Sequence, residues 1–222
     1  MRNLFWRSFA NALSLVALGI TVSSFSGLNI SAACAAEPGS TDDMLTTGNE
    51  LYKQKKYAEA RAFFRNRLNV LEKRHGNNSP QILGALSDVV KASCAGEYCV
   101  DASPELLRMA QIRLATYGPQ CRELPANWQM LGETKEKHGK YKEAVPYFER
   151  AVAAQKLINS KSKSKDSLDI LFAMNLARAL EKSGEKAKAQ KLYKSLEKDA
   201  LSRGLKPDDQ LVRSIVARSQ GR

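Results

Sequence analysis

A pattern of small and large residues recurs along this chain at a nearly constant interval, and it limits the fold more than any other feature. The pattern is clearest in one stretch, at Trp128, Leu131, Gly132, Gly139, Tyr141, Ala144, Phe148 and Ala151. The same offsets recur on either side, at Gly48, Tyr57, Ala60 and Phe64 and again at Leu176, Ala177, Gly184, Ala189 and Tyr193. Such self-similarity is typical of stacked repeats, in which each unit covers the apolar face of its neighbour.

The repeats are predicted to begin near Thr41, Leu83, Pro125 and Ile170, at spacings of 42, 42 and 45 residues. The second start is implied by apolar residues at the first-helix core positions, although its second helix departs from the pattern. Past residue 40 the apolar residues follow a helical period, and no stretch alternates as a strand would. Small residues are expected to let neighbouring helices approach closely, and large ones to fill the gaps between pairs.

These spacings resemble the tetratricopeptide repeat (TPR), a helix–turn–helix unit of about 34 residues. The extra residues follow the second helix, and the segment 68–80 is similar to the long TPR variant of kinesin light chains. The resemblance covers residues 41–204. It implies an all-α fold, a right-handed TPR-like α-solenoid of about four helix pairs with a capping helix at the C-terminal end.

The predicted organisation is a signal peptide over 1–36, a short linker over 37–40, helical repeats over 41–206, and a capping helix and tail over 207–222. The predicted helices span 42–54, 57–74, 80–93, 103–117, 124–138, 141–157, 166–183, 187–203 and 207–219. The segment 160–165 alternates serine with lysine and is expected to be an exposed loop.

The first 36 residues have the features of an export signal. Arg2 and Arg7 precede an apolar stretch, and Ala33 and Ala35 satisfy the small-x-small rule for cleavage before residue 36. Cleavage before residue 37 fits equally. An exported protein, periplasmic or extracellular, is therefore expected. Two alternatives stay open, namely an uncleaved membrane anchor and a lipoprotein modified at Cys34, whose box has serine where leucine is usual.

The sequence offers little for catalysis or metal binding. It has only two histidines, His75 and His138, and each is placed beside a glycine at a predicted helix end. Phosphate-binding glycine loops, serine-hydrolase elbows and zinc-type cysteine pairs are absent. We therefore expect a protein that is not an enzyme, with no catalytic residues, no cofactor and no metal.

Three cysteines remain after signal removal, and they predict one disulfide. Cys94 and Cys99 both fall at the turn inside the second helix pair, whereas Cys121 follows a helix of about 14 residues, roughly 20 Å long. Because a disulfide needs Cα atoms within about 7 Å, Cys94–Cys99 is the favoured pair. A state with all three thiols reduced is the alternative.

The TPR resemblance implies a binding module whose concave groove is lined by the first helix of each pair. The groove positions carried over are Leu45, Asn49, Tyr52, Lys53, Ser87, Asp88, Lys91, Gln129, Met130, Glu133, Lys137, Met174, Asn175, Arg178 and Lys182. Asn49, Asn175 and Arg178 are candidate donors to a peptide backbone or carboxylate. The chaperone-binding clamp of some TPR proteins is not matched, because Leu45 stands at a lysine position. An unidentified protein or peptide is the expected partner, and nucleic acid is not.

The net charge of +12 is concentrated in the last 90 residues, which hold 21 basic and 12 acidic side chains. This imbalance supports an alternative function, a cell-envelope tether whose basic C-terminal half binds anionic lipid or wall polymer. Lys186, Lys188, Lys191 and Lys194 would join the loop in such contacts. A solvated lysine-rich surface that keeps the protein soluble accounts for the same composition.

Overall fold

Helices and the turns that join them make up the described part of the chain, which contains no strand. The computed structural model describes residues 40–96, 100–162 and 167–221. The predicted signal peptide and linker lie outside these residues, apart from Ser40. The elements are α1 Thr41–Lys53, α2 Tyr57–His75, the 3-10 turn η1 Pro80–Ile82, α3 Leu83–Ser93, α4 Ser103–Tyr117, α5 Leu124–Lys137, α6 Tyr141–Ser162, α7 Leu168–Lys182, α8 Lys186–Ser202 and α9 Gln210–Ser219.

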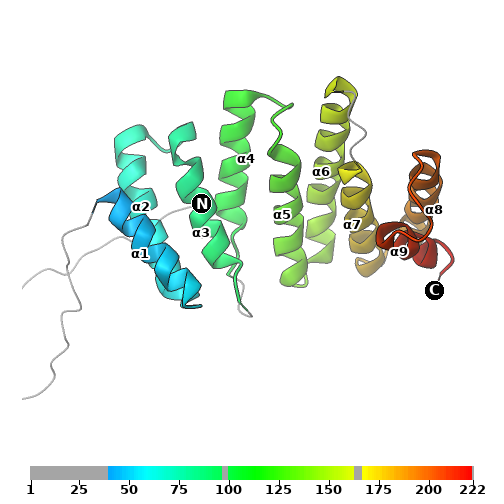
Figure 1. The fold of residues 1–222 in the computed structure, drawn as a ribbon, viewed down its shortest axis with the longest axis horizontal. Helices are drawn as coiled ribbons and strands as arrows, with labels where there is room; N and C mark the ends of the chain where they lie inside the picture. Colours follow the sequence, from blue (N-terminus) through cyan, green and yellow to red (C-terminus); the bar gives the residue numbers. More distant parts are fainter. Residues whose placement is uncertain (1–39, 97–99, 163–166, 222) are drawn as a thin grey trace, which may run out of the picture. The chain divides into compact units, whose positions relative to one another are not determined.

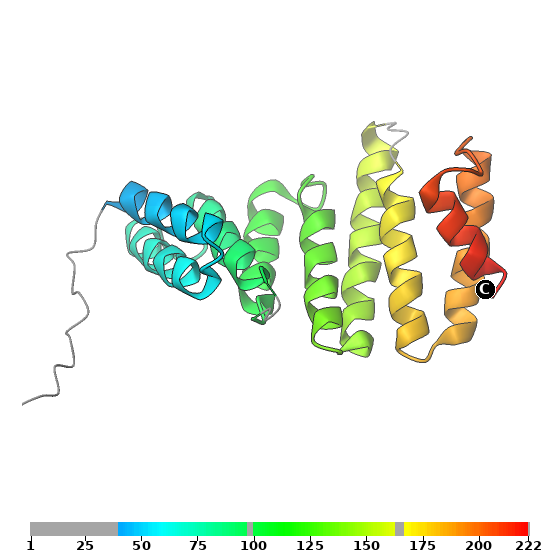
Figure 2. The ribbon, with the colours of Figure 1, turned by 60° about the horizontal axis from the view of Figure 1, so that its bottom comes forward.

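These helices pack in chain order, each against the next, and this confirms the all-α solenoid. The pairs are α1–α2, α3–α4, α5–α6 and α7–α8, with α9 against α8 at the end (Figures 1 and 2). The turn inside each pair lies at one edge of the row in Figure 1, and the connection between pairs lies at the opposite edge. Side chains at one repeat position therefore fall on one edge or one face.

In three of the four pairs, the same kind of three-residue turn joins the first helix to the second. The backbone N–H of the last turn residue donates to a carbonyl five residues earlier, at 2.9 Å for Lys56 to Leu51, 2.9 Å for Lys140 to Lys135 and 2.8 Å for Glu185 to Leu180. The middle residue of each turn has a left-handed backbone, which glycine adopts most easily. Gly139 and Gly184 meet this need, but the first turn uses Lys55, with φ of 62°.

Close packing of glycine against phenylalanine fixes the helix pairs. A Cβ atom added to Gly132 would lie 2.5 Å from Cε1 of Phe148, and one added to Gly48 would lie 2.5 Å from Cε1 of Phe64. Both phenylalanine rings are fully buried. The predicted close approach at small residues is therefore confirmed in the first and third pairs.

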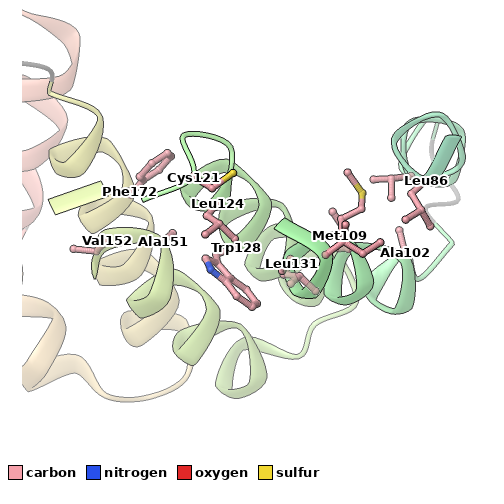
Figure 3. Close-up of a cluster of buried hydrophobic side chains, with 14 of the residues drawn as sticks. Leu86, Ala102, Met109, Cys121, Leu124, Trp128, Leu131, Ala151, Val152 and Phe172 are labelled. Carbon is pink, nitrogen blue, oxygen red and sulfur yellow. The ribbon is translucent and has the colours of Figure 1, made fainter. Parts of the chain in front are cut away.

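The second pair keeps the repeat register that its sequence obscures. Val90 and Leu106 stand 42 residues before Gly132 and Phe148, and both are buried, as is Ala102 at the alanine position. Compared with the third pair, the second pair has a larger residue on its first helix, Val90 in place of glycine, and a smaller one on its second helix, Leu106 in place of phenylalanine. Figure 3 shows part of the continuous core, from Leu86 and Met109 through Leu131 and Trp128 to Phe172.

Two predicted boundaries are wrong. Helix α6 continues to Ser162, so residues 160–162 are helical and not a loop; the Gln155 amide donates to Asn159 at 2.9 Å on this added length. Residues 163–166 lie outside the described residues. Helix α9 begins at Gln210 and not at 207, because Asp209 caps it by accepting from the Leu211 N–H at 3.4 Å.

Trp128 is buried, with 8% of its surface exposed. Its indole stacks on the Tyr147 ring at 6.3 Å, and the Arg150 guanidinium lies 5.0 Å from the indole centroid. Both neighbours belong to α6, the second helix of its own pair. These ring contacts therefore tie α5 to α6.

Candidate functional site

The first helices of the pairs, α1, α3, α5 and α7, are linked directly to one another by a ladder of contacts. The ladder runs through one repeat position, occupied by Tyr52, Cys94, Glu136 and Glu181 at spacings of 42, 42 and 45 residues. In each case a basic side chain from the next first helix, or from α9 at the end, reaches this position. We call the surface that these helices share the first-helix face.

Each contact of the ladder is short. The Lys91 ammonium lies 4.4 Å from the Tyr52 ring centroid. Lys137 Nζ donates to the Cys94 carbonyl at 3.3 Å.

The last two contacts are ion pairs. Arg178 Nη2 donates to Glu136 Oε2 at 3.0 Å, and Arg218 Nη1 donates to Glu181 Oε2 at 2.7 Å. A cationic side chain therefore links each first helix to the next first helix along the row, and links the last of them to α9.

The predicted groove residues differ in their exposure to solvent. Lys53 and Glu133 are exposed, and Asn49 is half-buried. Gln129 and Asn175 are buried, with 6% and 9% of their surface exposed.

Several of the remaining predicted groove residues make contacts within the protein. The Tyr52 ring receives Lys91 and packs edge-on against Tyr57 at 5.1 Å, whereas the Lys182 ammonium lies 5.1 Å from the Tyr141 ring. Arg178, expected as a donor to a ligand, donates to Glu136 instead.

Helix α5 carries two buried acceptor atoms without a hydrogen bond. The Gln129 amide nitrogen donates to Glu133 at 2.9 Å, but Gln129 Oε1 has no partner. Glu136 Oε1 also has none, although Oε2 is bound by Arg178. Buried acceptors are rarely left unpaired, because the lost hydration is not replaced. Because both atoms are buried, another molecule can reach them only where the side chains that cover them move aside.

Two of the first helices also carry exposed apolar side chains. Met130 on α5 is 39% exposed, and Leu171 on α7 is 38% exposed. Met130 is among the groove positions obtained from the sequence, but Leu171 is not. A signal for it exists, since the equivalent positions Asp42, Gly84 and Ala126 are exposed as well.

Cys121 is a buried thiol, and Cys99 lies outside the described residues. The Cys121 Sγ donates to Glu123 Oε2 at 3.0 Å. Burial, with the Glu123 carboxylate beside it, raises the pKa of the Cys121 thiol. The Cys94–Cys99 disulfide stays a prediction.

Metal and membrane features are not found in the part of the chain that the structure describes. No group of three His, Cys, Asp or Glu side chains there could hold a metal ion. None of the helices described is both long and apolar enough to cross a bilayer.

Comparison with known proteins identifies the repeat. Residues 125–156, which form α5 and most of α6, match the family model for the tetratricopeptide repeat. This is a TPR-like fold. The TPR match falls on the pair in which the sequence pattern is clearest. No curated protein is significantly similar to the chain in sequence.

Solved structures show the same TPR-like architecture over most of the chain. Two crystal structures of nearly identical TPR-like repeats, from a protein of Podosopora anserina assigned as a kinesin light chain, align with a TM-score of 0.64 each. One, a variant with a single substitution, is 17% identical and covers 83% of this chain and 88% of its own; the other is 16% identical, with 84% and 89% covered. TPR arrays serve as protein-interaction scaffolds, and this chain has that architecture.

Proposed function

We propose that the protein is a non-enzymatic, exported scaffold that binds a segment of a partner protein along its first-helix face. The observation that carries this proposal is the exposure of two apolar side chains on first helices, Met130 on α5 and Leu171 on α7. On α5, the buried Oε1 atom of Gln129 also accepts no hydrogen bond. A segment that lies across α5 and displaces the side chains covering this atom can donate a backbone N–H to it.

The exposed apolar residues define where such a segment gains its affinity. Met130 and Leu171 are more than a third exposed on helices whose other apolar residues are mostly buried. Covering them removes apolar surface from water, which is the main favourable term in most protein association. Glu133 is exposed on the same helix as Met130 and can supply a polar contact, whereas Asn49 and Lys53 lie on α1, at the other end of the row of first helices.

Site-specific photocrosslinking tests the proposed face. Benzoylphenylalanine is placed at Leu171 in one variant and at Leu201 in a matched control, where a leucine on α8 is 44% exposed. We expect a discrete crosslinked partner from Leu171 and none from Leu201 in cells that express the protein at native level. Equal crosslinking from both positions would contradict the proposal.

Export is part of the proposal and has its own test. The basic start, apolar stretch and alanine-rich end of residues 1–36 support removal of a signal peptide. Intact-mass measurement of the native protein should give an N-terminus at Ala36 or Glu37. A mass that retains the first residues would favour an anchor, and diacylglycerol on Cys34 would favour a lipoprotein.

A further inference from the structure

The turns inside the third and fourth helix pairs form a concentrated basic surface. The segments 137–143 and 182–188 occupy the same repeat positions, and together they hold six lysines, two glutamates and no arginine. Figure 1 shows that the α5–α6 and α7–α8 turns lie at the same edge of the row. We call this surface the lysine edge, and its lysines are Lys137, Lys140, Lys142, Lys182, Lys186 and Lys188.

The lysines of this edge are exposed, and half of them have no partner among the described residues. Lys140, Lys142 and Lys186 are exposed and form no ion pair with any described residue. Lys188 pairs with Glu185 at 2.5 Å. Glu143 Oε2 lies 3.7 Å from Nζ of Lys135, a lysine that precedes the segment 137–143. The positive charge of the edge is therefore only partly compensated within the protein.

A shallow cavity opens on this edge between the two turns. Its volume is about 320 Å³, and its lining includes Lys140, Lys142 and Lys182 together with Tyr141, Ser183 and Glu143. Three lysines thus line a space large enough for one phosphate or carboxylate group. The Lys182 ammonium is steadied by the Tyr141 ring, 5.1 Å away.

Helix stability accounts for Lys188, which pairs with the N-cap residue Glu185, but not for Lys186. Lys186 and Lys188 occupy the first turn of α8, which has no acidic residue in that turn and no side-chain cap. A positive charge at a helix N-terminus is unfavourable, because the helix dipole is positive there. Helix α1 has the favourable arrangement, with Asp42 and Asp43 in its first turn. Residues that oppose a local stability rule mark functional surfaces more often than others.

We propose that the lysine edge docks the protein on the surface of an anionic phospholipid bilayer. Because both turns lie at one edge, a plane can contact them together, and a lipid phosphate can enter the cavity between them. The absence of arginine favours a fluid layer of headgroups over a protein partner, since shaped carboxylate recognition typically uses arginine forks. None of the large exposed apolar side chains lies in either segment, so the attachment is electrostatic and peripheral.

The corresponding segments of the other two pairs limit the docking surface. Residues 95–101 contain two acids and no lysine, so the second turn interrupts the basic edge. Residues 53–59 again contain three lysines, Lys53, Lys55 and Lys56. The docking surface is therefore centred on the third and fourth pairs.

Vesicle binding of the full chain, as it is purified from its native host, tests the proposal. The probe is a set of large unilamellar vesicles with 30% phosphatidylglycerol, compared with vesicles of phosphatidylcholine alone. The variant replaces Lys140, Lys142 and Lys182 by glutamine. The matched control replaces Lys191, Lys194 and Lys198 by glutamine, which removes the same charge from the exposed face of α8.

The lysine-edge variant should bind anionic vesicles on the order of 100-fold more weakly than the parent, since each lysine near an anionic surface contributes about fivefold. The α8 control should lose less than tenfold, and raised salt should release the parent. Thermal unfolding should show that both variants keep the parent's melting temperature within a few degrees.

Three results would overturn the proposal. They are an equal loss in the two variants, no binding of the parent to anionic vesicles, and parent binding that soluble polyglutamate abolishes at the same charge concentration as the vesicles. The variant Leu171→Glu, which changes the proposed partner-binding face, should bind vesicles as the parent does. A failure of the bilayer proposal can therefore be distinguished from a failure of the proposed scaffold function.

Discussion

Replacing Gly132 by alanine should destabilise the protein, although alanine is the better helix former. The new Cβ atom would lie 2.5 Å from Cε1 and 2.7 Å from Cζ of Phe148, far inside van der Waals contact. The ring is fully buried and cannot swing into solvent. Helix α5 must therefore move away from α6, or the ring must leave its preferred rotamer.

The magnitude follows from two opposed terms. Overpacking of a close-packed core costs about 1–3 kcal/mol, and the enclosed ring places this site near 3 kcal/mol. Alanine in a helix interior gains about 1 kcal/mol over glycine. We expect a net loss near 2 kcal/mol in the free energy of unfolding, which lowers the melting temperature by roughly 4–8 °C in a chain of this size.

Gly84→Ala is the matched control, because nothing lies within 4 Å of a Cβ added there. That variant should gain up to about 1 kcal/mol. Urea denaturation followed by circular dichroism measures both. Adding Phe148→Leu to Gly132→Ala should recover part of the loss, since the second pair already combines Val90 with Leu106. Equal stability of Gly132→Ala and Gly84→Ala would refute the packing argument.

Four further predictions address other features. Trp128→Ala should cost about 3–5 kcal/mol in thermal unfolding, as for other buried aromatic truncations, and an unchanged transition would contradict the repeat register. Lys55→Gly should stabilise by about 0.5–1 kcal/mol, because relief of a left-handed backbone, about 1–2 kcal/mol, exceeds the added chain entropy; a loss of stability would argue against the turn. Cys121 should react slowly with iodoacetamide at pH 8 and rapidly in urea, since its raised pKa leaves less thiolate in the folded protein than in the unfolded one. Non-reducing peptide mapping should show a Cys94–Cys99 link, and a link to Cys121 would show that the pair geometry is wrong.

The sequence predicts the helices well because the signals for them are local. All the predicted helices except the last begin within two residues of an observed helix or of the 3-10 turn η1, and glycines such as Gly76 and Gly118 end helices as expected. The miss at α6 has a physical reason. Serine and lysine do not stop a helix as glycine or proline do, so the serine–lysine segment extends α6 to Ser162.

Repeat register also transfers from sequence to structure, even where the motif is weak. Ala102 and Leu106 stand at the alanine and phenylalanine positions and are buried there, although α4 begins only at Ser103, later in its repeat than α2 does at Tyr57. At these two core positions, Val90 and Leu106 replace the glycine and phenylalanine of the third pair. A motif that requires fixed residue types does not recognise such a compensating change in side-chain size.

The candidate site was only partly within reach of the sequence. Groove positions can be obtained from the repeat, but their state depends on neighbours in other repeats. Arg178 is paired with Glu136, 42 residues away, and Gln129 is buried with an unpaired oxygen. Neither fact follows from local pattern, because each depends on the packing of helices that are distant in sequence.

The central claim is that the first-helix face binds a partner segment, and the affinity of that segment for two matched variants tests it most directly. The segment found by crosslinking at Leu171 is titrated by calorimetry against Leu171→Glu and Leu201→Glu, which place the same charge at leucines that are 38% and 44% exposed. The account predicts that Leu171→Glu weakens binding at least tenfold, whereas Leu201→Glu leaves it unchanged. Unchanged binding to Leu171→Glu, or an equal loss in both variants, would contradict it.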